Sequence, residues 1–285
     1  MTPPVLLQYV LPHRLLTTIV HWATRWGWKP WKNFLIDQIV ARYDVDLNEA
    51  QISDRDQFEN FNAFFTRALK NGVRNLDALP TAIICPADGR ISQAGAIEAG
   101  RIFQAKGQSY SAAELLVDAI SAEPYANGSF ATVYLSPRDY HRVHMPLSGR
   151  LRETVHIPGR LYSVAPFAVQ DIPRLFARNE RLVCHFDGEH GPFVVVMVGA
   201  MLVASVTTVW SGLEIPPFGK RIVRKDWRDR NIDLARGAEM ARFNMGSTAI
   251  VLVPNDASLL ALQAEQSVKL GDVIGNWRGF TAATI

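Results

Sequence analysis

The sequence is poor in the features that mark several common classes of protein. Its 285 residues include only two cysteines, Cys85 and Cys184, which lie far apart and form no CxxC pattern. This scarcity argues against a disulfide framework and a zinc knuckle, and it favours a reducing compartment with both thiols in the core. The formal net charge of +3 is too small and too dispersed to indicate nucleic-acid binding.

Long apolar runs are also missing. Residues 12–14 and Arg25 interrupt the two apolar stretches near the N-terminus, so neither reaches the roughly 18 residues that a membrane span needs. The sequence therefore predicts no transmembrane helix. Hydrophobic residues still make up 48% of the chain, which is enough for a large core.

The N-terminal segment is basic, rich in tryptophan and helical in its pattern. Residues 1–43 carry five basic side chains against one acidic side chain. Apolar residues recur there at helical spacing: Leu15, Leu16, Ile19, Val20, Ala23 and Trp26. The nearby tryptophans are Trp22, Trp26, Trp28 and Trp31. Because tryptophan and basic side chains favour the water–lipid boundary, we expect residues 1–75 to be a helical region that contacts a membrane surface. The alternative is a helix whose apolar face packs on the protein's own core.

Two further helices are expected at 33–43 and 56–69, the second with a possible cap at Ser53 or Asp54. From about Pro80 the pattern changes to short β-rich runs between glycines and prolines. The predicted strands cover 81–85, 129–135, 161–164, 193–198, 202–209 and 249–253. The fold class is therefore α+β, with N-terminal amphipathic helices followed by a predominantly β catalytic body at 76–285. Stretches at 146–155 and 268–275 resemble turns of biotinyl and lipoyl carrier domains, so we expect this body to resemble barrel-sandwich hybrid folds.

Reactive side chains occur in three loops, which contain Asp88, the pair His141 and His144, and the dipeptide Gly246-Ser247. Taken singly, each has an ordinary explanation. Asp88 fits an Asx turn, the histidines fit loop positions or two ligands of a metal site, and Gly246-Ser247 fits a turn before a strand. No further grouping completes a metal site, so none is predicted. Together the loops supply a carboxylate, an imidazole and a hydroxyl, which are the parts needed to activate a serine nucleophile.

Seven stretches resemble the pyruvoyl-dependent phosphatidylserine decarboxylases of the bacterial and mitochondrial type. They are FFTR at 64–67, PADGRIS at 86–92, YHRVHMPLSGRL at 140–151, GRLYSV at 159–164, LFARNERLVC at 175–184, VGAMLVASV at 198–206 and RFNMGSTAIVL at 242–252. They occur in order through most of the chain, which makes chance agreement very improbable. Two departures stand out: Met245 replaces the leucine that is common in the family, and Ala165 replaces an asparagine.

The resemblance implies that the chain cuts itself. Asp88 would orient His144, which would deprotonate Ser247 so that its hydroxyl attacks the carbonyl of Gly246 and forms an ester. Elimination would then break the chain into a β chain, 1–246, and an α chain, 247–285.

The resemblance also implies the cofactor and the reaction. Ser247 would become a pyruvoyl group, which would form a Schiff base with the amine of phosphatidylserine and accept the electrons left by carbon dioxide. His141 would be the acid that protonates the resulting carbanion, or an organiser of that step, and the product would be phosphatidylethanolamine. The enzyme would be a lyase of phospholipid biosynthesis that is made as a zymogen.

The substrate also implies a location. Its acyl chains stay in the bilayer, so we expect a peripheral protein on an anionic membrane, at the cytoplasmic face of the cell membrane, and a homo-oligomer as its assembly. Two alternatives remain open from the residues alone. One is a zinc-dependent hydrolase on a related scaffold that uses His141 and His144, and the other is a non-enzymatic carrier-like or lipid-surface binding module.

Overall fold

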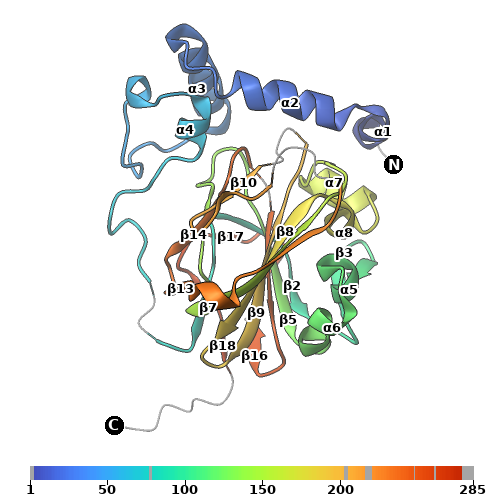
Figure 1. Cartoon of the computed structure of the whole chain (residues 1–285). Coiled ribbons are helices and arrows are strands. Elements are labelled where there is room, and N and C mark those ends of the chain that lie inside the picture. Colours follow the sequence, from blue (N-terminus) through green and yellow to red (C-terminus); the bar gives the residue numbers. More distant parts are fainter. Residues whose placement is uncertain are drawn as a thin grey trace.

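The computed structural model describes residues 3–76, 79–201, 205–215, 220–246, 248–259 and 261–277. The N-terminal helices lie across one end of a strand-rich body (Figure 1). The α+β class predicted from the sequence is therefore confirmed, with short helices first and most strands after them.

Three helices open the chain: α1 (Pro3–Val10), α2 (His13–Ala23) and α3 (Lys29–Tyr43). The helices predicted near 14–26 and at 33–43 are thus confirmed. Helix α3 begins earlier than predicted because Pro30 lies in its first turn, where the missing N–H of proline costs nothing. In the parts of the chain that the structure describes, no helix is both long enough and apolar enough to cross a membrane.

Helix α2 turns its apolar face away from the body. His13 and Thr17 are buried against the rest of the protein, whereas Leu15, Ile19 and Trp22 are 59%, 53% and 65% exposed. The alternative in which this face packs on the protein's own core is therefore wrong for these three side chains.

The helix predicted at 56–69 is wrong in its length. The structure has a single 3-10 turn, η1 (Arg55–Gln57), and a short helix, α4 (Phe61–Phe65), each with its own N-terminal cap. Asp54 accepts a hydrogen bond from the backbone N–H of Asp56, and Asn60 accepts one from that of Ala63. Two caps so close together divide the segment, because each satisfies the free N–H groups of a separate helix start.

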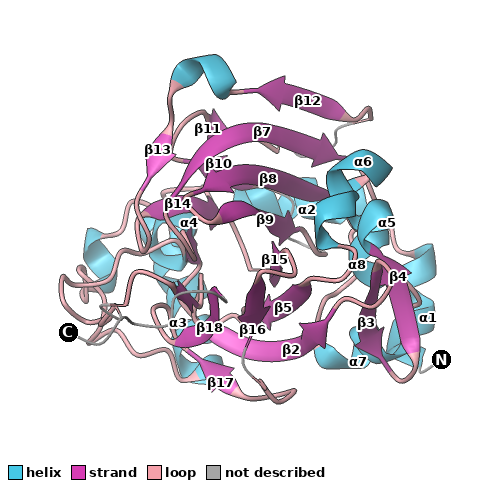
Figure 2. Cartoon of the chain, turned by 90° about the horizontal axis from the view of Figure 1, so that it is seen from below, coloured by secondary structure: helices cyan, strands magenta, loops and turns pink. Residues whose placement is uncertain are grey.

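The body is built on a nine-stranded antiparallel sheet, whose curvature is clear in Figure 2. Its strands run in the order β12 (Val223–Asp226), β7 (Gly149–Ile157), β8 (Arg181–Gly188), β9 (Gly191–Val198), β15 (Thr248–Val253), β5 (Ser129–Tyr134), β2 (Gly89–Ala96) and β17 (Ser267–Val268), with β13 (Asp233–Leu234) also paired to β7. The strands predicted at 129–135, 193–198 and 249–253 correspond to β5, β9 and β15 and are confirmed.

Three smaller sheets complete the described strands. One has the order β11 (Gly212–Leu213), β10 (Val206–Thr208), β14 (Glu239–Phe243) and β6 (Arg142–His144); another has the order β1 (Ala82–Ile84), β18 (Val273–Trp277) and β16 (Ala257–Leu259); the last is the hairpin of β3 (Arg101–Ala105) and β4 (Gln108–Ser111). Strand β1 confirms the prediction at 81–85. Short helices also occur in the body: α5 (Ala112–Leu116), α6 (Ala119–Ala122), η2 (Glu123–Tyr125), α7 (Pro166–Asp171), α8 (Leu175–Arg178) and η3 (Arg228–Arg230).

Strand β15 is the central strand around which both cores form. Ala249 and Val251 join the core between the nine-stranded and four-stranded sheets, and Ile250 and Leu252 join the core under α5, α7 and α8. Every residue of β15 is buried, which explains why its sequence is apolar without alternation. Position 247 immediately precedes this strand, so the residue there is attached to one of the most rigidly held parts of the molecule.

Two other predicted strands have different outcomes. The strand predicted at 161–164 is wrong, because side chains rather than a neighbouring strand form the hydrogen bonds of this backbone. The backbone of Tyr162 exchanges hydrogen bonds with the side chain of Asn179, and Ser163 N–H donates to the side chain of Gln8. The strand predicted at 202–209 is confirmed at β10, while residues 202–204 lie outside the described residues. Both cysteines are fully buried free thiols, as predicted.

Candidate active site

The segment before position 247 is held in an unusual backbone conformation. Met245 has a φ of 82°, in the left-handed region that non-glycine residues rarely occupy. Asn244 fixes this bend, because its side-chain amide donates to Ser205 Oγ at 3.0 Å and to Thr207 Oγ1 at 2.8 Å. Ser247 itself lies outside the described residues. Its neighbours Gly246 and Thr248 are described, and they show where the bond between residues 246 and 247 lies.

His141 lies directly beside Gly246. A Cβ atom added to Gly246 would be 3.0 Å from Nε2 of His141, which is unusually tight, and 3.6 Å from the ring of Phe65, which is an ordinary contact. The Phe65 and His141 rings are 4.0 Å apart between centroids. The histidine loop and α4 therefore meet at Gly246, whose carbonyl Ser247 is expected to attack, and the lack of a side chain on Gly246 makes this approach possible.

The protonation state of His141 follows from its surroundings. Its Nδ1 is 2.7 Å from the carbonyl oxygen of Asp139, which can only accept, so Nδ1 carries the hydrogen and Nε2 carries a lone pair. Complete burial, and then the charge of Arg67, lower the pKa of His141 to about 3. At neutral pH the ring is uncharged and Nε2 can accept a proton.

Two buried polar atoms close to position 247 lack partners. Within the described ranges, neither Nε2 of His141 nor Oγ1 of Thr248 has a hydrogen-bond partner, although both residues are fully buried. Such atoms are costly to bury and commonly mark a place where another polar group belongs. The Thr248 hydroxyl can donate to a carbonyl oxygen at position 247, such as a pyruvoyl group would present, and Nε2 of His141 can accept a proton there.

His144 has both ring nitrogens occupied by other groups. Nδ1 donates to the carbonyl of Gly237 at 2.8 Å, which leaves Nε2 to accept from the hydroxyl of Tyr140 at 2.9 Å. Burial lowers the pKa of His144, so this ring is also held in its neutral form. To act on Ser247, His144 must release the Tyr140 hydroxyl or pass a proton through it.

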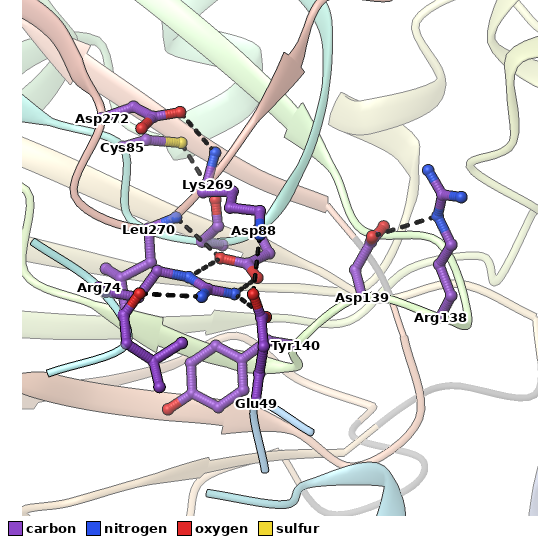
Figure 3. A network of polar contacts seen from close by, with 12 residues as sticks. Glu49, Arg74, Cys85, Asp88, Arg138, Asp139, Tyr140, Lys269, Leu270 and Asp272 are labelled. Carbon is purple, nitrogen blue, oxygen red and sulfur yellow. Dashed lines mark hydrogen bonds and ion pairs between the residues drawn. The ribbon is translucent and has the colours of Figure 1, made fainter. Parts of the chain in front are cut away.

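Asp88 is bound to Arg74 rather than to His144. Figure 3 shows Arg74 between the carboxylates of Asp88 and Glu49. Asp88 also accepts a hydrogen bond from the backbone N–H of Leu270 at 2.8 Å. The hydrogen bonds from Arg74 lower the pKa of Glu49 to about 2, which keeps that carboxylate charged at neutral pH. The structure thus brings Asp88 near His144 as a source of negative potential, without the direct contact expected from the sequence.

Sequence reasoning missed Arg74, Tyr140 and Asn244. Tyr140 and Asn244 stand inside stretches that carried the family resemblance, so their place in those motifs was a usable signal. Arg74 stands alone in the connection before β1, and nothing in its local sequence indicates that it reaches Asp88.

Replacing Arg74 with alanine should destabilise the protein strongly, because it leaves the buried carboxylate of Asp88 without its partner. The Arg74 and Asp88 side chains are only 8% and 11% exposed, and breaking such a pair typically costs about 3–5 kcal/mol. Urea unfolding in a Ser247→Ala background, where only an uncut chain is present, measures this change. The matched control is Arg90→Ala, whose ion pair with Glu265 is about half exposed and is worth about 1 kcal/mol or less. Equal losses for the two variants would contradict the proposed role of Arg74.

A neutral imidazole beside Gly246, an unpartnered hydroxyl on Thr248 and a bend at Met245 are therefore gathered around position 247. Comparisons with known proteins indicate a self-processing enzyme. The sequence model of the phosphatidylserine decarboxylase family matches residues 61–276, and a second family model, described as PSD, matches residues 3–44. The chain belongs to the phosphatidylserine decarboxylase family.

Individual relatives match over nearly their whole length. The phosphatidylserine decarboxylase proenzyme of Xanthomonas campestris pv. campestris (strain B100) is 61% identical over 270 residues, which are 94% of this chain and 96% of that protein. The protein of the same name from Xanthomonas oryzae pv. oryzae (strain MAFF 311018) is 61% identical over 271 residues, with the same two shares. That of Xylella fastidiosa (strain M12) is 57% identical over 272 residues, 95% of this chain and 93% of that protein.

Proposed function

We propose that this chain is a proenzyme that cuts itself between Gly246 and Ser247 and then decarboxylates phosphatidylserine to phosphatidylethanolamine. Family membership supports the activity and the pyruvoyl cofactor, which Ser247 would provide. The observation that carries the placement of the site is the pair of unpartnered buried atoms, on His141 and Thr248, close to position 247.

Maturation uses Ser247 as nucleophile, His144 as base and Asp88 as the nearby negative charge. The hydroxyl of Ser247 loses its proton and attacks the carbonyl carbon of Gly246, so an ester replaces the peptide bond. Removal of the Cα proton of residue 247 then expels Gly246 as a carboxylate and leaves dehydroalanine. One water molecule converts this residue to pyruvoyl and releases ammonia. In the uncut chain Nε2 of His144 accepts a hydrogen bond from the Tyr140 hydroxyl. This hydroxyl must therefore move away before His144 takes the proton of Ser247, or it must pass that proton to His144.

The mature site needs a group that moves a proton beside position 247. When present, the pyruvoyl group supplies a conjugated carbonyl that takes up the electron pair left by carbon dioxide. We assign to His141 the delivery of the proton that replaces the lost carboxylate, because its Nε2 faces Gly246 and has no other partner among the described groups. Phe65 covers the ring and keeps water from it.

Substrate supply requires contact with a bilayer, and α1 and α2 offer an apolar surface for it. Leu6, Leu15, Ile19, Trp22 and Trp26 are each 44–65% exposed, an amount of apolar surface that water disfavours. The net charge of residues 1–43 is positive, which suits an anionic membrane. The protein would therefore lie on the cytoplasmic face of the cell membrane, with these helices between the bilayer and the body.

Exchanging Ile19 and Trp22 together for serine should weaken binding to phosphatidylserine vesicles by roughly two to four orders of magnitude. Each large apolar side chain that leaves the bilayer costs about 1.5–3 kcal/mol. Co-sedimentation with vesicles measures the change, and Thr18→Ala, an exposed change on the same helix, is the control. Processing at Gly246 should persist in both variants. Unchanged vesicle binding by the double variant would refute the membrane role of α2.

The reaction itself is tested by supplying phosphatidylserine in vesicles and measuring phosphatidylethanolamine by mass spectrometry. The proposal predicts that product forms with purified protein alone and that borohydride or hydrazine, which attack carbonyl groups, abolish it. Absence of product, or activity that survives borohydride, would overturn the proposal.

Membership of the phosphatidylserine decarboxylase family stands against both alternatives raised from the sequence, the zinc-dependent hydrolase and the non-enzymatic module. Among residues 3–76, 79–201 and the later described ranges, no group of three or more His, Cys, Asp and Glu side chains could hold a metal ion. The homo-oligomer and the likeness of the body to barrel-sandwich hybrid folds stay predictions. Analytical ultracentrifugation would test the first, and an experimental structure compared with carrier domains would test the second.

A further inference from the structure

The surroundings of His141 pose a problem for its role in catalysis. Phe65, the Asp139 carbonyl and Gly246 enclose the ring, and Arg67 is the charged group that acts on it. Burial and the positive charge of Arg67 both disfavour a proton on Nε2, so the pKa lies near 3 in the uncut chain. At neutral pH such a ring is unprotonated almost all the time, so it has no proton to deliver to a carbanion.

Maturation changes one of these neighbours chemically. Elimination breaks the ester bond between the Gly246 carbonyl carbon and the Ser247 oxygen, and the electron pair leaves with Gly246 as a carboxylate. The carboxylate carbon is attached to the Cα whose added Cβ would be 3.0 Å from Nε2 of His141. The new negative charge is therefore created on the residue that lies against an imidazole nitrogen with no other partner among the described groups.

We propose that the α-carboxylate left on Gly246 stays beside Nε2 of His141 and strengthens the hold of this ring on a proton. Maturation then does two things at once: it makes the cofactor from residue 247, and it converts the histidine beside it from a weak base into an acid that can serve the reaction. The inference rests on the proposed function, because no carboxylate forms at Gly246 unless the chain is cut there.

Arg67 is the competitor for the new carboxylate. It is 95% buried, it donates from Nη2 to the Arg138 carbonyl at 3.0 Å, and its Nε and Nη1 have no partner within the described ranges. A carboxylate that bound Arg67 instead would neutralise the Arg67 charge and act on His141 only from a greater distance. It would also leave Nε2 of His141 without a partner. The close approach of Nε2 to Gly246 favours His141 as the partner of the carboxylate.

The test compares His141 in mature and uncut protein by NMR of ¹⁵N-labelled histidine. Mature wild type carries the Gly246 carboxylate, and Ser247→Ala keeps the peptide bond. An opposite charge within about 4–6 Å raises the pKa of a histidine by about 1–3. The titration midpoint of His141 should therefore be at least about one pH unit higher in the mature protein. The spectrum of His141→Gln identifies the signal. His185 is an internal control, because it is also buried, with both nitrogens unpartnered in the described structure, but Arg152, Arg224 and Asp118 surround it instead.

The outcomes separate this inference from the function beneath it. A cleaved wild-type protein with equal His141 midpoints in both forms, including the case of a carboxylate bound by Arg67, would overturn the inference and leave the proposed function standing. Wild-type protein that stays uncut, which a gel shows before any titration, would overturn both. A rise at His185 as large as that at His141 would also overturn it, because the change would then be a general effect of cleavage.

Discussion

Replacing Ser247 with alanine is expected to leave one uncut chain without detectable decarboxylase activity. Alanine has no hydroxyl to attack the Gly246 carbonyl, so neither the ester nor the pyruvoyl group can form. The fold should persist, because β15 begins only at Thr248 and its pairing with β5 and β9 does not use the side chain at 247. Gel electrophoresis and intact mass measure the cleavage, and phosphatidylethanolamine formation measures the activity.

A second serine provides the control for this variant. Ser267 is exposed at the start of β17, at the edge of the nine-stranded sheet. Ser267→Ala should be processed fully and should keep its activity. A Ser247→Ala protein that still separates into two chains would show that the backbone breaks by another route, and the assignment of Ser247 would have to be abandoned.

The two histidines are expected to fail at different stages. His141→Gln should be cut normally but should form phosphatidylethanolamine about 10²–10⁴ times more slowly, the usual loss when a general acid or base is removed. Glutamine can keep the hydrogen bond to the Asp139 carbonyl, so the loop should hold its shape. His144→Gln should stay uncut, because it lacks the base that activates Ser247.

His141 lies in contact with Gly246, so the two variants decide which histidine serves cleavage and which serves decarboxylation. Processing is followed over time on gels, and activity is measured on whatever fraction is cut. His190, at the turn between β8 and β9 and at the far end of the sheet from position 247, provides the control His190→Gln, which should be cut and active. An uncut His141→Gln protein together with a normally cut His144→Gln protein would reverse the two roles.

The central strand β15 could be predicted from sequence because a strand that is buried on both faces consists almost entirely of apolar residues. Ile250, Val251 and Leu252 are apolar without alternation, and a short β-branched run of this kind after a Gly-Ser-Thr step favours a strand with a core on each face. The three reactive loops could be found because each carries a short motif. Their meeting at one place depends on pairings such as β14 with β6, which local sequence does not specify.

The orientation of α2 could not be predicted from periodicity. The spacing of Leu15, Ile19 and Trp22 defines a face, but it gives no direction for that face relative to the body. The length of the helix predicted at 56–69 was wrong for a related reason, since the phenylalanines share one core cluster although they do not share one helix.

The partner of Asp88 was hidden for a geometric reason. Arg74 and Asp88 lie in separate loops, and a third segment far along the chain joins them through the hydrogen bond from Leu270 N–H to Asp88. Long-range ion pairs of this kind leave no periodic signal. The motif at 140–151 singles out Tyr140, but the hydrogen bond from its hydroxyl to Nε2 of His144 becomes visible only in the structure.

The state of the bond between Gly246 and Ser247 in the purified wild-type protein tests the account most directly. Intact mass spectrometry under denaturing conditions should find two chains, one ending at Gly246 and one beginning with a pyruvoyl group in place of Ser247. The second chain should resist Edman degradation and gain mass with borohydride. A single full-length chain with an unmodified serine at 247, in protein that nonetheless makes phosphatidylethanolamine, would contradict the account.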